Sequence, residues 1–247
     1  MKKCVVVGCS YASDWASHIG LPRFPIWPEL LADHLKLKLV NLSRPGASNK
    51  EIMSKALDAV VKYNDIEALF VMWTEMDRIS FQAEQPWWKS FSPETSYREK
   101  VENFPGCQDI SKLIIENDCS QLQAIVNDTI RTMYTFQTVM DHLGIKYIHM
   151  QGTSPNSFMT FPVYKFSRAI TKAPHFNRIN EVKLLGWPCT RNIGGWNMDD
   201  FFRFHLKDDN LTFEDCTIDG ENDAHPNELG NVYIFHIMKN HYEQTYS

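Results

Sequence analysis

Short apolar runs alternate along the chain with segments in which apolar residues recur at intervals of three and four. Four segments have the pattern of strands, at residues 4–8, 37–42, 68–73 and 145–150. The intervening spacing predicts helices over 29–37, over about 49–60 and from residue 119 or 120 to 143. Strands that alternate with helices favour a parallel sheet with right-handed crossovers. We therefore predict an α/β protein, a three-layer α/β/α sandwich with a mainly parallel sheet.

Two long segments, about 82–108 and 153–215, lack periodicity and are rich in prolines and aromatic residues. We interpret them as insertions, and the second has the length of a binding loop or lid. Tryptophans at 87, 88, 187 and 196 would form local cores in them, with sugar-stacking platforms as the alternative. No linker or block of charge divides the chain, so residues 1–247 are expected to form a single domain.

Composition narrows the class of protein. A hydrophobic fraction of 43% is typical of a soluble globular chain, and a net charge of −5 disfavours a nucleic-acid binder. The apolar run after Lys3 is shorter than the ~7–15 residues of an export signal, and none approaches the ~20 of a membrane span. We expect a cytoplasmic protein without a membrane partner.

The cysteines do not have the spacing of a metal site or a disulfide framework. They lie at residues 4, 9, 107, 119, 189 and 216, with no C-x-x-C pair. Reduced thiols in a cytosol-like environment are the simplest interpretation. We expect neither a metal nor an organic cofactor.

The candidate chemistry starts at Ser10, which follows the first strand in the turn Gly8-Cys9-Ser10. Such a turn presents a hydroxyl at the carboxyl edge of the sheet, where open α/β folds bind ligands. By itself the pattern also describes a strand followed by a serine-capped helix. A later segment, Asp223-Ala224-His225-Pro226-Asn227, precedes the last predicted helix, and Pro226 suits the first turn of that helix. A histidine there is also compatible with a purely structural helix start.

Three short blocks in this order resemble those of the SGNH, or GDSL-like, hydrolase family, whose fold is a flavodoxin-like α/β/α sandwich. They are Gly8-Cys9-Ser10, Asn41 with Gly46, and Asp223 to Asn227. The resemblance implies that Ser10 is the nucleophile and His225 its general base, since a serine hydroxyl is a weak nucleophile until a base takes its proton. It also implies an oxyanion hole formed by the backbone N–H groups of Ser10 and Gly46.

The third block departs from the family pattern. Where the family carries a glycine and an asparagine that donates to the oxyanion, this chain has Trp73-Thr74-Glu75-Met76-Asp77-Arg78. An ionised glutamate cannot donate a hydrogen bond. The Thr74 hydroxyl is our candidate for the missing donor, with the charge of Arg78 as the alternative.

Two further positions differ from the family. The aspartate expected three residues before the histidine is Asn222 here, so we assign the orienting carboxylate to Asp223 and keep Asn222 or a backbone carbonyl as alternatives. Cys9 replaces the aspartate of the first block. It could be the nucleophile instead of Ser10, but no charged neighbour in the sequence would lower its pKa. Tyr11, Trp73 and Asn49, which adjoin the blocks, are expected to contact the substrate.

The resemblance predicts a serine esterase or deacylase that hydrolyses an acyl or carbohydrate ester, for example an O-acetylated sugar, through an acyl-enzyme. A second hypothesis is a catalytically degenerate binding or structural protein. The aromatic insertions and the Asp-x-His-Pro-Asn ending are similar to SGNH-like proteins of bacterial viruses, so this hypothesis includes a virion component or a self-associating protein. A third, a nucleotide-binding Rossmann-like domain, is disfavoured because the chain lacks a G-x-G-x-x-G run.

Overall fold

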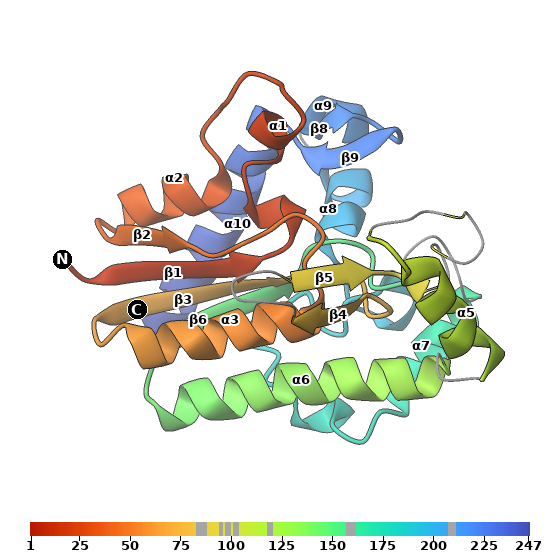
Figure 1. Cartoon of the computed structure of the whole chain (residues 1–247). Coiled ribbons are helices and arrows are strands. Elements are labelled where there is room, and N and C mark those ends of the chain that lie inside the picture. The colour runs from red at the N-terminus through yellow and green to blue at the C-terminus, as the bar shows by residue number, and fades with distance from the viewer. Residues whose placement is uncertain are drawn as a thin grey trace.

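The protein is built on a five-stranded sheet in which every strand is parallel to its neighbours (Figure 1). The computed structural model describes residues 1–82, 88–93, 96, 100, 104–117, 121–156, 162–206 and 211–247. The strands are β1 (Lys3–Gly8), β2 (Lys38–Asn41), β3 (Ile66–Trp73), β6 (Lys146–Gln151) and β7 (Leu184–Leu185), in the order β2-β1-β3-β6-β7. The four strands expected from the sequence are confirmed, and β7 comes from a segment without a strand pattern.

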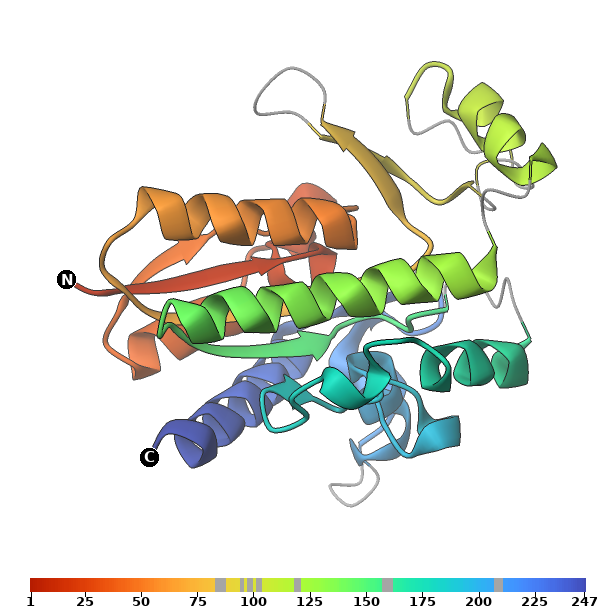
Figure 2. The same ribbon diagram turned by 90° about the horizontal axis from the view of Figure 1, so that it is seen from below.

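Helices cover both faces of the sheet (Figures 1 and 2). On one face lie α3 (Asn49–Lys62), α6 (Leu122–His142) and α7 (Val163–Thr171). On the other lie α2 (Trp27–His34), α8 (Met198–Phe204), α9 (Phe213–Cys216) and α10 (Glu228–Tyr246). The predicted three-layer α/β/α sandwich with a parallel sheet is therefore confirmed.

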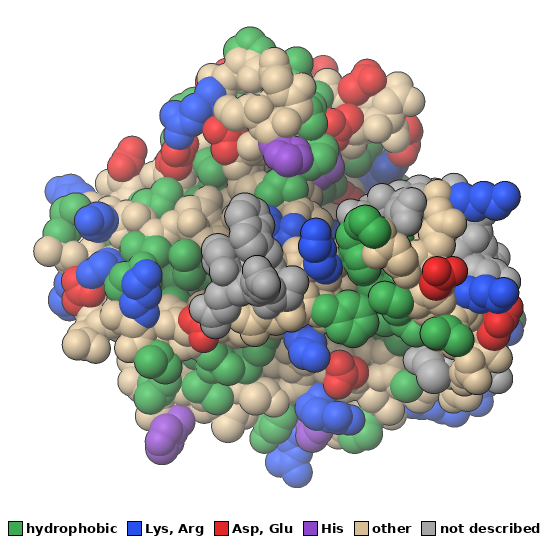
Figure 3. Space-filling model, viewed as in Figure 1, with side chains coloured by type: hydrophobic (Ala, Val, Ile, Leu, Met, Phe, Trp, Pro, Cys, Tyr) green, Lys and Arg blue, Asp and Glu red, His purple; other side chains and the backbone are tan. Residues whose placement is uncertain are grey.

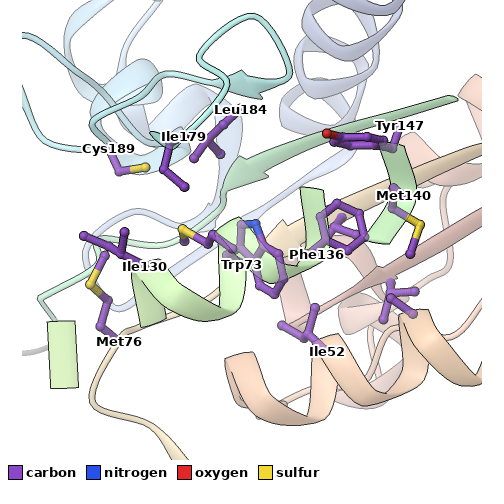
Figure 4. Close-up of a cluster of buried hydrophobic side chains, with 14 of the residues drawn as sticks. Ile52, Trp73, Met76, Ile130, Phe136, Met140, Tyr147, Ile179, Leu184 and Cys189 are labelled. Atoms are coloured by element: carbon purple, nitrogen blue, oxygen red, sulfur yellow. The ribbon is translucent and has the colours of Figure 1, made fainter. Parts of the chain in front are cut away.

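Successive residues of the central strands point alternately into two hydrophobic cores, one on each face of the sheet. Val71 and Trp73 of β3 pack with α3 and α6, whereas Phe70 and Met72 face α2 and α10. In the first core the Trp73 ring meets the edge of Phe136, with ring centroids 5.7 Å apart (Figure 4). Side chains alternate between the faces of a strand, and both faces are buried here. This explains the unbroken apolar runs at residues 4–7 of β1 and 68–73 of β3.

The start of α3 is held by a buried carboxylate. Ser48 accepts a hydrogen bond from the Glu51 N–H at 3.2 Å, as the capping-box spacing predicts. The Glu51 side chain does not return to Ser48, so the second bond of a capping box is not formed. It is fully buried and bound by Arg44 at 2.6 Å and Lys55 at 3.0 Å. Burial raises the pKa of Glu51, but these cations lower it by more, so the carboxylate stays charged and fixes the loop before α3.

The segment before the last helix differs from its predicted form. Asp223–Pro226 is a strand, β9, which pairs in an antiparallel hairpin with β8 (Thr217–Asp219). The helix α10 starts at Glu228, two residues later than expected, because the Asn227 side chain accepts from the Gly230 N–H at 3.0 Å and caps it. Pro226 is thus the end of a strand and not the first turn of a helix. Asp223 and His225, two apart on a strand, share one face.

The two predicted insertions contain regular structure. The first forms a hairpin of β4 (Ile79–Gln82) and β5 (Trp88–Phe91) and the helix α5 (Cys107–Glu116), which project from the sheet in Figure 2. The second carries α7, β7, α8 and the one-turn helices η3 (Phe176–Arg178) and η4 (Arg191–Ile193), and α9 begins near its end. Trp87 and Cys119 lie outside the described residues.

The surface carries charges of both signs. Figure 3 shows Lys and Arg side chains interspersed with Asp and Glu over the viewed face. In the part of the chain that the structure describes, no helix combines the length and apolarity needed to cross a membrane.

Candidate active site

Ser10 lies immediately beyond the carboxyl end of the central strand β1, as the first residue of the one-turn helix η1 (Ser10–Ala12). The turn requires a glycine at position 8, since a Cβ there would come within 3.0 Å of the Cβ atoms of both Ala12 and Met72. The Ser10 Oγ is 2.7 Å from Nε2 of His225, which comes from the opposite end of the chain. The structure therefore brings together the two residues that the sequence proposed as a pair.

Asp223 completes a chain of hydrogen bonds through the imidazole. Its Oδ1 is 2.5 Å from His225 Nδ1 and also accepts the His225 backbone N–H at 3.1 Å. Asn222, the alternative orienting residue, instead donates to Asp219 Oδ2 at 3.2 Å. With Asp223 accepting the proton on Nδ1, the neutral ring presents an unprotonated Nε2 to the serine.

The surroundings favour a neutral histidine beside an ionised aspartate. Burial lowers the pKa of His225, and the hydrogen bond to Asp223 only partly opposes this effect. For Asp223, burial raises the pKa, but hydrogen bonds from Trp15 and His225 lower it by more, so its pKa stays below the ordinary value. This is the charge state that a general base and its orienting carboxylate need near neutral pH.

Trp15, which the sequence did not single out, holds both members of this pair. It belongs to the short helix α1 (Trp15–His18). Its indole stacks on the His225 ring, with centroids 4.1 Å apart and planes 22° from parallel. Its Nε1 donates to the second oxygen of Asp223 at 3.0 Å. One side chain thus fixes the plane of the base and satisfies the remaining oxygen of the carboxylate.

These residues open onto a cleft of about 570 Å³ at the carboxyl edge of the sheet. Most of the lining residues have polar side chains, and they come from six separate parts of the chain, namely Ser10, Tyr11, Trp15, Gly46, Glu75, Arg78, Thr153, Ser154, Asp199, Glu221, Asn222, Asp223, Ala224 and His225. Such a cleft at the ends of parallel strands is the usual ligand site of an open α/β fold.

Gly46 also lines the cleft and lies in the loop between β2 and α3. Its φ is +72°, a left-handed conformation that strains any residue with a Cβ. No atom lies within 4 Å of the position that a Cβ would take. The glycine is therefore required by its backbone conformation and not by lack of space.

Thr74 does not supply the third oxyanion donor that we expected. It is fully buried, and its hydroxyl donates to the carboxylate of the neighbouring Glu75. Its backbone N–H donates to Asn49 Oδ1 at 2.9 Å, and the Asn49 amide returns a hydrogen bond to the Thr74 carbonyl at 3.1 Å. Asn49, expected to contact substrate, instead anchors the backbone of the third block.

Glu75 and Arg78 form an ion pair at the position where the family pattern has its asparagine. Both line the cleft, with Arg78 Nη2 at 2.7 Å from Glu75 Oε2. An N–H of the same guanidinium contacts the Ala47 carbonyl at 3.4 Å, beside Gly46. Arg78, our alternative donor, therefore reaches the wall of the cleft but is already paired with a carboxylate.

The structure separates the other expected contact residues. Tyr11 lines the cleft with a nearly buried ring. Trp73 is fully buried in the core (Figure 4). Its Nε1 donates to His149 Nδ1 at 2.8 Å. The expectation that Trp73 contacts the substrate is corrected, because the last residue of β3 points into the α3 and α6 layer and not over the edge of the sheet.

The alternative nucleophile, Cys9, is fully buried next to Ser10. Burial raises the pKa of its thiol to about 11, so the reactive thiolate is scarce near neutral pH. Cys4, Cys189 and Cys216 are likewise buried thiols outside any disulfide. Within the described ranges, no three His, Cys, Asp or Glu side chains are grouped so that they could hold a metal ion.

Asp199 is the second residue of the cleft that sequence reasoning missed. It lies in α8, within the aperiodic segment 153–215, and its carboxyl contacts the Tyr11 hydroxyl. The only signal was indirect, since the length of that segment favoured a role at a binding site. Trp15 follows Ser10 by five residues, but nothing in the local pattern connects it to residues over 200 positions away.

Comparisons with known proteins give structural and not sequence similarity. No family model matches the chain, and no curated protein sequence matches it either. Similar solved structures include LAE5, an alpha/beta hydrolase enzyme from the metagenome of Lake Arreo, Spain, which is 13% identical with a TM-score of 0.52 over 100% of this chain and 97% of that chain.

Two further structures are TesA, 14% identical with a TM-score of 0.50 over 99% of both chains, and a putative lipolytic protein of the G-D-S-L family from Desulfitobacterium hafniense DCB-2. The latter is 12% identical with a TM-score of 0.46 over 99% of both chains. Identities this low establish architecture and not activity. A central parallel sheet flanked by helices is the architecture that this chain shares with LAE5 and TesA.

Proposed function

We propose that the protein is a serine esterase or deacylase that acts through Ser10, His225 and Asp223. The observation that carries the proposal is the continuous chain of contacts from Ser10 Oγ to His225 Nε2, at 2.7 Å, and from His225 Nδ1 to Asp223 Oδ1, at 2.5 Å. A serine in this arrangement can transfer its proton to the ring while it attacks a carbonyl carbon.

The proposed reaction has two halves. Ser10 Oγ attacks the ester carbonyl, His225 Nε2 takes the hydroxyl proton, and the N–H groups of Ser10 and Gly46 stabilise the oxyanion. When the tetrahedral intermediate collapses, the C–O bond breaks and His225 returns the proton to the leaving alcohol. Water then attacks the acyl-Ser10 ester by the same route, which releases the acid and restores the hydroxyl. Asp223 stays ionised throughout and stabilises the imidazolium.

The shape and polarity of the cleft support a short acyl group and a polar alcohol. On one side of Ser10, the hollow among Trp15, Phe24 and Ile26 has no room for a water molecule, so it cannot receive an acyl chain. Most of the residues that line the open side have charged or hydroxyl-bearing side chains, which can bond the hydroxyl groups of a sugar. An acetyl ester of a carbohydrate fits these features.

A fluorophosphonate probe tests the proposal directly, with intact mass as the readout. We expect one adduct on Ser10, and none in Ser10→Ala or His225→Ala. Ser13→Ala is the matched control, since Ser13 lies in the same turn and donates only to the Ser10 carbonyl at 3.2 Å. Hydrolysis of nitrophenyl acetate in preference to the octanoate, and of an acetylated xylose, would then support the substrate class. A folded wild-type protein without an adduct would refute the proposal.

One observation favours the alternative of a catalytically degenerate binding protein, including the virion role considered above. The third block offers a carboxylate, Glu75, where a donor to the oxyanion would lie. Loss of one such donor typically costs about 10²–10³ in rate. Absence of probe labelling, together with binding of an acetylated sugar to the cleft without turnover, would support this alternative.

A further inference from the structure

The Tyr11 hydroxyl has two oxygen partners but only one proton to donate. Its oxygen is 2.5 Å from Asp199 Oδ1 and 2.8 Å from the carbonyl oxygen of Ala224. A carbonyl oxygen can only accept a hydrogen bond, so the tyrosine proton is needed for the contact to Ala224. The shorter contact to Asp199 then requires a proton on the carboxyl oxygen, because two oxygens without a hydrogen between them repel at this distance.

The other oxygen of Asp199 is compatible with this assignment. Asp199 Oδ2 accepts the backbone N–H of Ser154 at 2.9 Å, which leaves Oδ1 as the oxygen that carries the proton. We propose that Asp199 is a positioning residue that works in its protonated form, donating to Tyr11 so that Tyr11 can donate to the Ala224 carbonyl. The proposal rests on the proposed function for its activity readout, and its geometry concerns groups outside the proposed triad.

We call the hydrogen bonds from Asp199 to Tyr11 and from Tyr11 to the Ala224 carbonyl a relay, and the position of Ala224 connects this relay to the proposed triad. Ala224 lies between Asp223 and His225 on β9, so a hydrogen bond to its carbonyl fixes the strand that presents both residues. Tyr11 follows Ser10 directly, and its ring centroid lies 5.3 Å from that of His225. The relay therefore links the second insertion to the nucleophile turn and to the strand that carries the base.

The charged and titratable groups around Asp199 come from several elements. Tyr11 faces it from η1, Glu75 from the loop after β3, and Arg203 from its own helix α8. Burial is the largest influence and raises the pKa of Asp199 to about 6, against the lowering effects of Tyr11, Ser154 and Arg203. Above that pH the ionised carboxylate would accept the hydrogen bond of the Tyr11 hydroxyl, and the Ala224 carbonyl would lose its donor.

The test is the pH profile of kcat/KM for three matched proteins. In the wild type we expect a descending limb near pH 6, with a loss of about two- to tenfold, the effect of losing one ordinary hydrogen bond. Asp199→Asn keeps an N–H donor for Tyr11 and an oxygen for Ser154 at every pH. Its profile should lack that limb, whereas Asp199→Ala should show the reduced rate throughout.

A descending limb that persists unchanged in Asp199→Asn would overturn the proposal, as would a wild-type profile without one. Rates for Asp199→Asn as low as those for Asp199→Ala below pH 6 would also overturn it. If Ser10 proves unreactive, the same variants are read by ¹³C NMR of labelled aspartate carboxyls. A resonance that is absent from Asp199→Asn and titrates near pH 6 supports the relay, and one already ionised at pH 4.5 contradicts it. Failure of the esterase proposal is thereby distinguished from failure of this one.

Discussion

The most demanding prediction concerns Asp223→Asn, which changes one oxygen to an N–H₂ group without changing the shape of the side chain. Asp223 accepts from His225 Nδ1 with one oxygen and from Trp15 Nε1, at 3.0 Å, with the other. An amide has only one accepting oxygen. If the oxygen faces Trp15, the NH₂ group faces Nδ1, and the ring must carry its proton on Nε2. The histidine then donates to Ser10 and cannot accept its proton.

The size of the effect follows from the loss of this tautomer. We expect kcat to fall about 10⁴-fold, or ~5.5 kcal/mol of transition-state stabilisation, with little change in KM. The assay is the steady-state hydrolysis of nitrophenyl acetate near neutral pH. Circular dichroism should show an unchanged fold, because Asn keeps the volume of Asp.

Asn222→Ala is the discriminating control, since the exposed Asn222 amide contacts Asp219 and not the histidine. It should lose less than about tenfold, a typical limit for losing one exposed hydrogen bond. Equal losses in Asp223→Asn and Asn222→Ala, or an Asp223→Asn protein within about tenfold of wild type, would refute the tautomer argument.

Two further substitutions test the residues that support the site. Trp15→Phe keeps an aromatic face on His225 but removes the donor to Asp223. We expect kcat to fall about tenfold, the effect of losing one hydrogen bond to a charged group. An unchanged kcat would show that the indole N–H is not needed. Gly46→Ala forces a Cβ onto a residue with φ of +72°, a strain of roughly 1–2 kcal/mol that should lower Tm by about 2–8 °C. Gly144→Ala, at φ +67° in the loop after α6, should lose similar stability and keep its activity, and equal loss of activity in both would argue against a role for the Gly46 N–H.

The parts of the fold predicted correctly are those in which local pattern and tertiary environment agree. Strands β1 and β3 contain unbroken apolar runs, at residues 4–7 and 68–73, because both of their faces are buried there. Helix α6 shows helical spacing because one stripe faces the core. The start of α10 was misplaced by two residues. Pro226 suits a first helical turn, but the capping bond of Asn227 and the pairing of β9 with β8 decide the boundary.

At the site, the order of the motifs in the sequence predicted which residues lie near the cleft but not the directions of their side chains. Ser10, Gly46, Asp223 and His225 do line the cleft. Trp73 is the last residue of β3 and Thr74 follows it, yet both side chains are buried. Alternation along β3 directs Trp73 to the core, and a hydrogen bond to Asn49 holds the backbone of Thr74. Contacts such as Trp15 with Asp223, which join residues 208 positions apart, depend on the fold and leave no local pattern.

The contact between Ser10 and His225 also has a consequence during synthesis of the chain. Ser10 leaves the ribosome before its histidine, which lies 215 residues later in the chain. At a typical ~5–20 residues per second, Ser10 spends on the order of 10–40 seconds without the partner that would accept its proton. A nascent or truncated chain that ends before β9 therefore carries an unreactive serine, however well its sheet has formed. Reactivity at Ser10 would report that β9, which carries His225, has packed against the turn that carries Ser10.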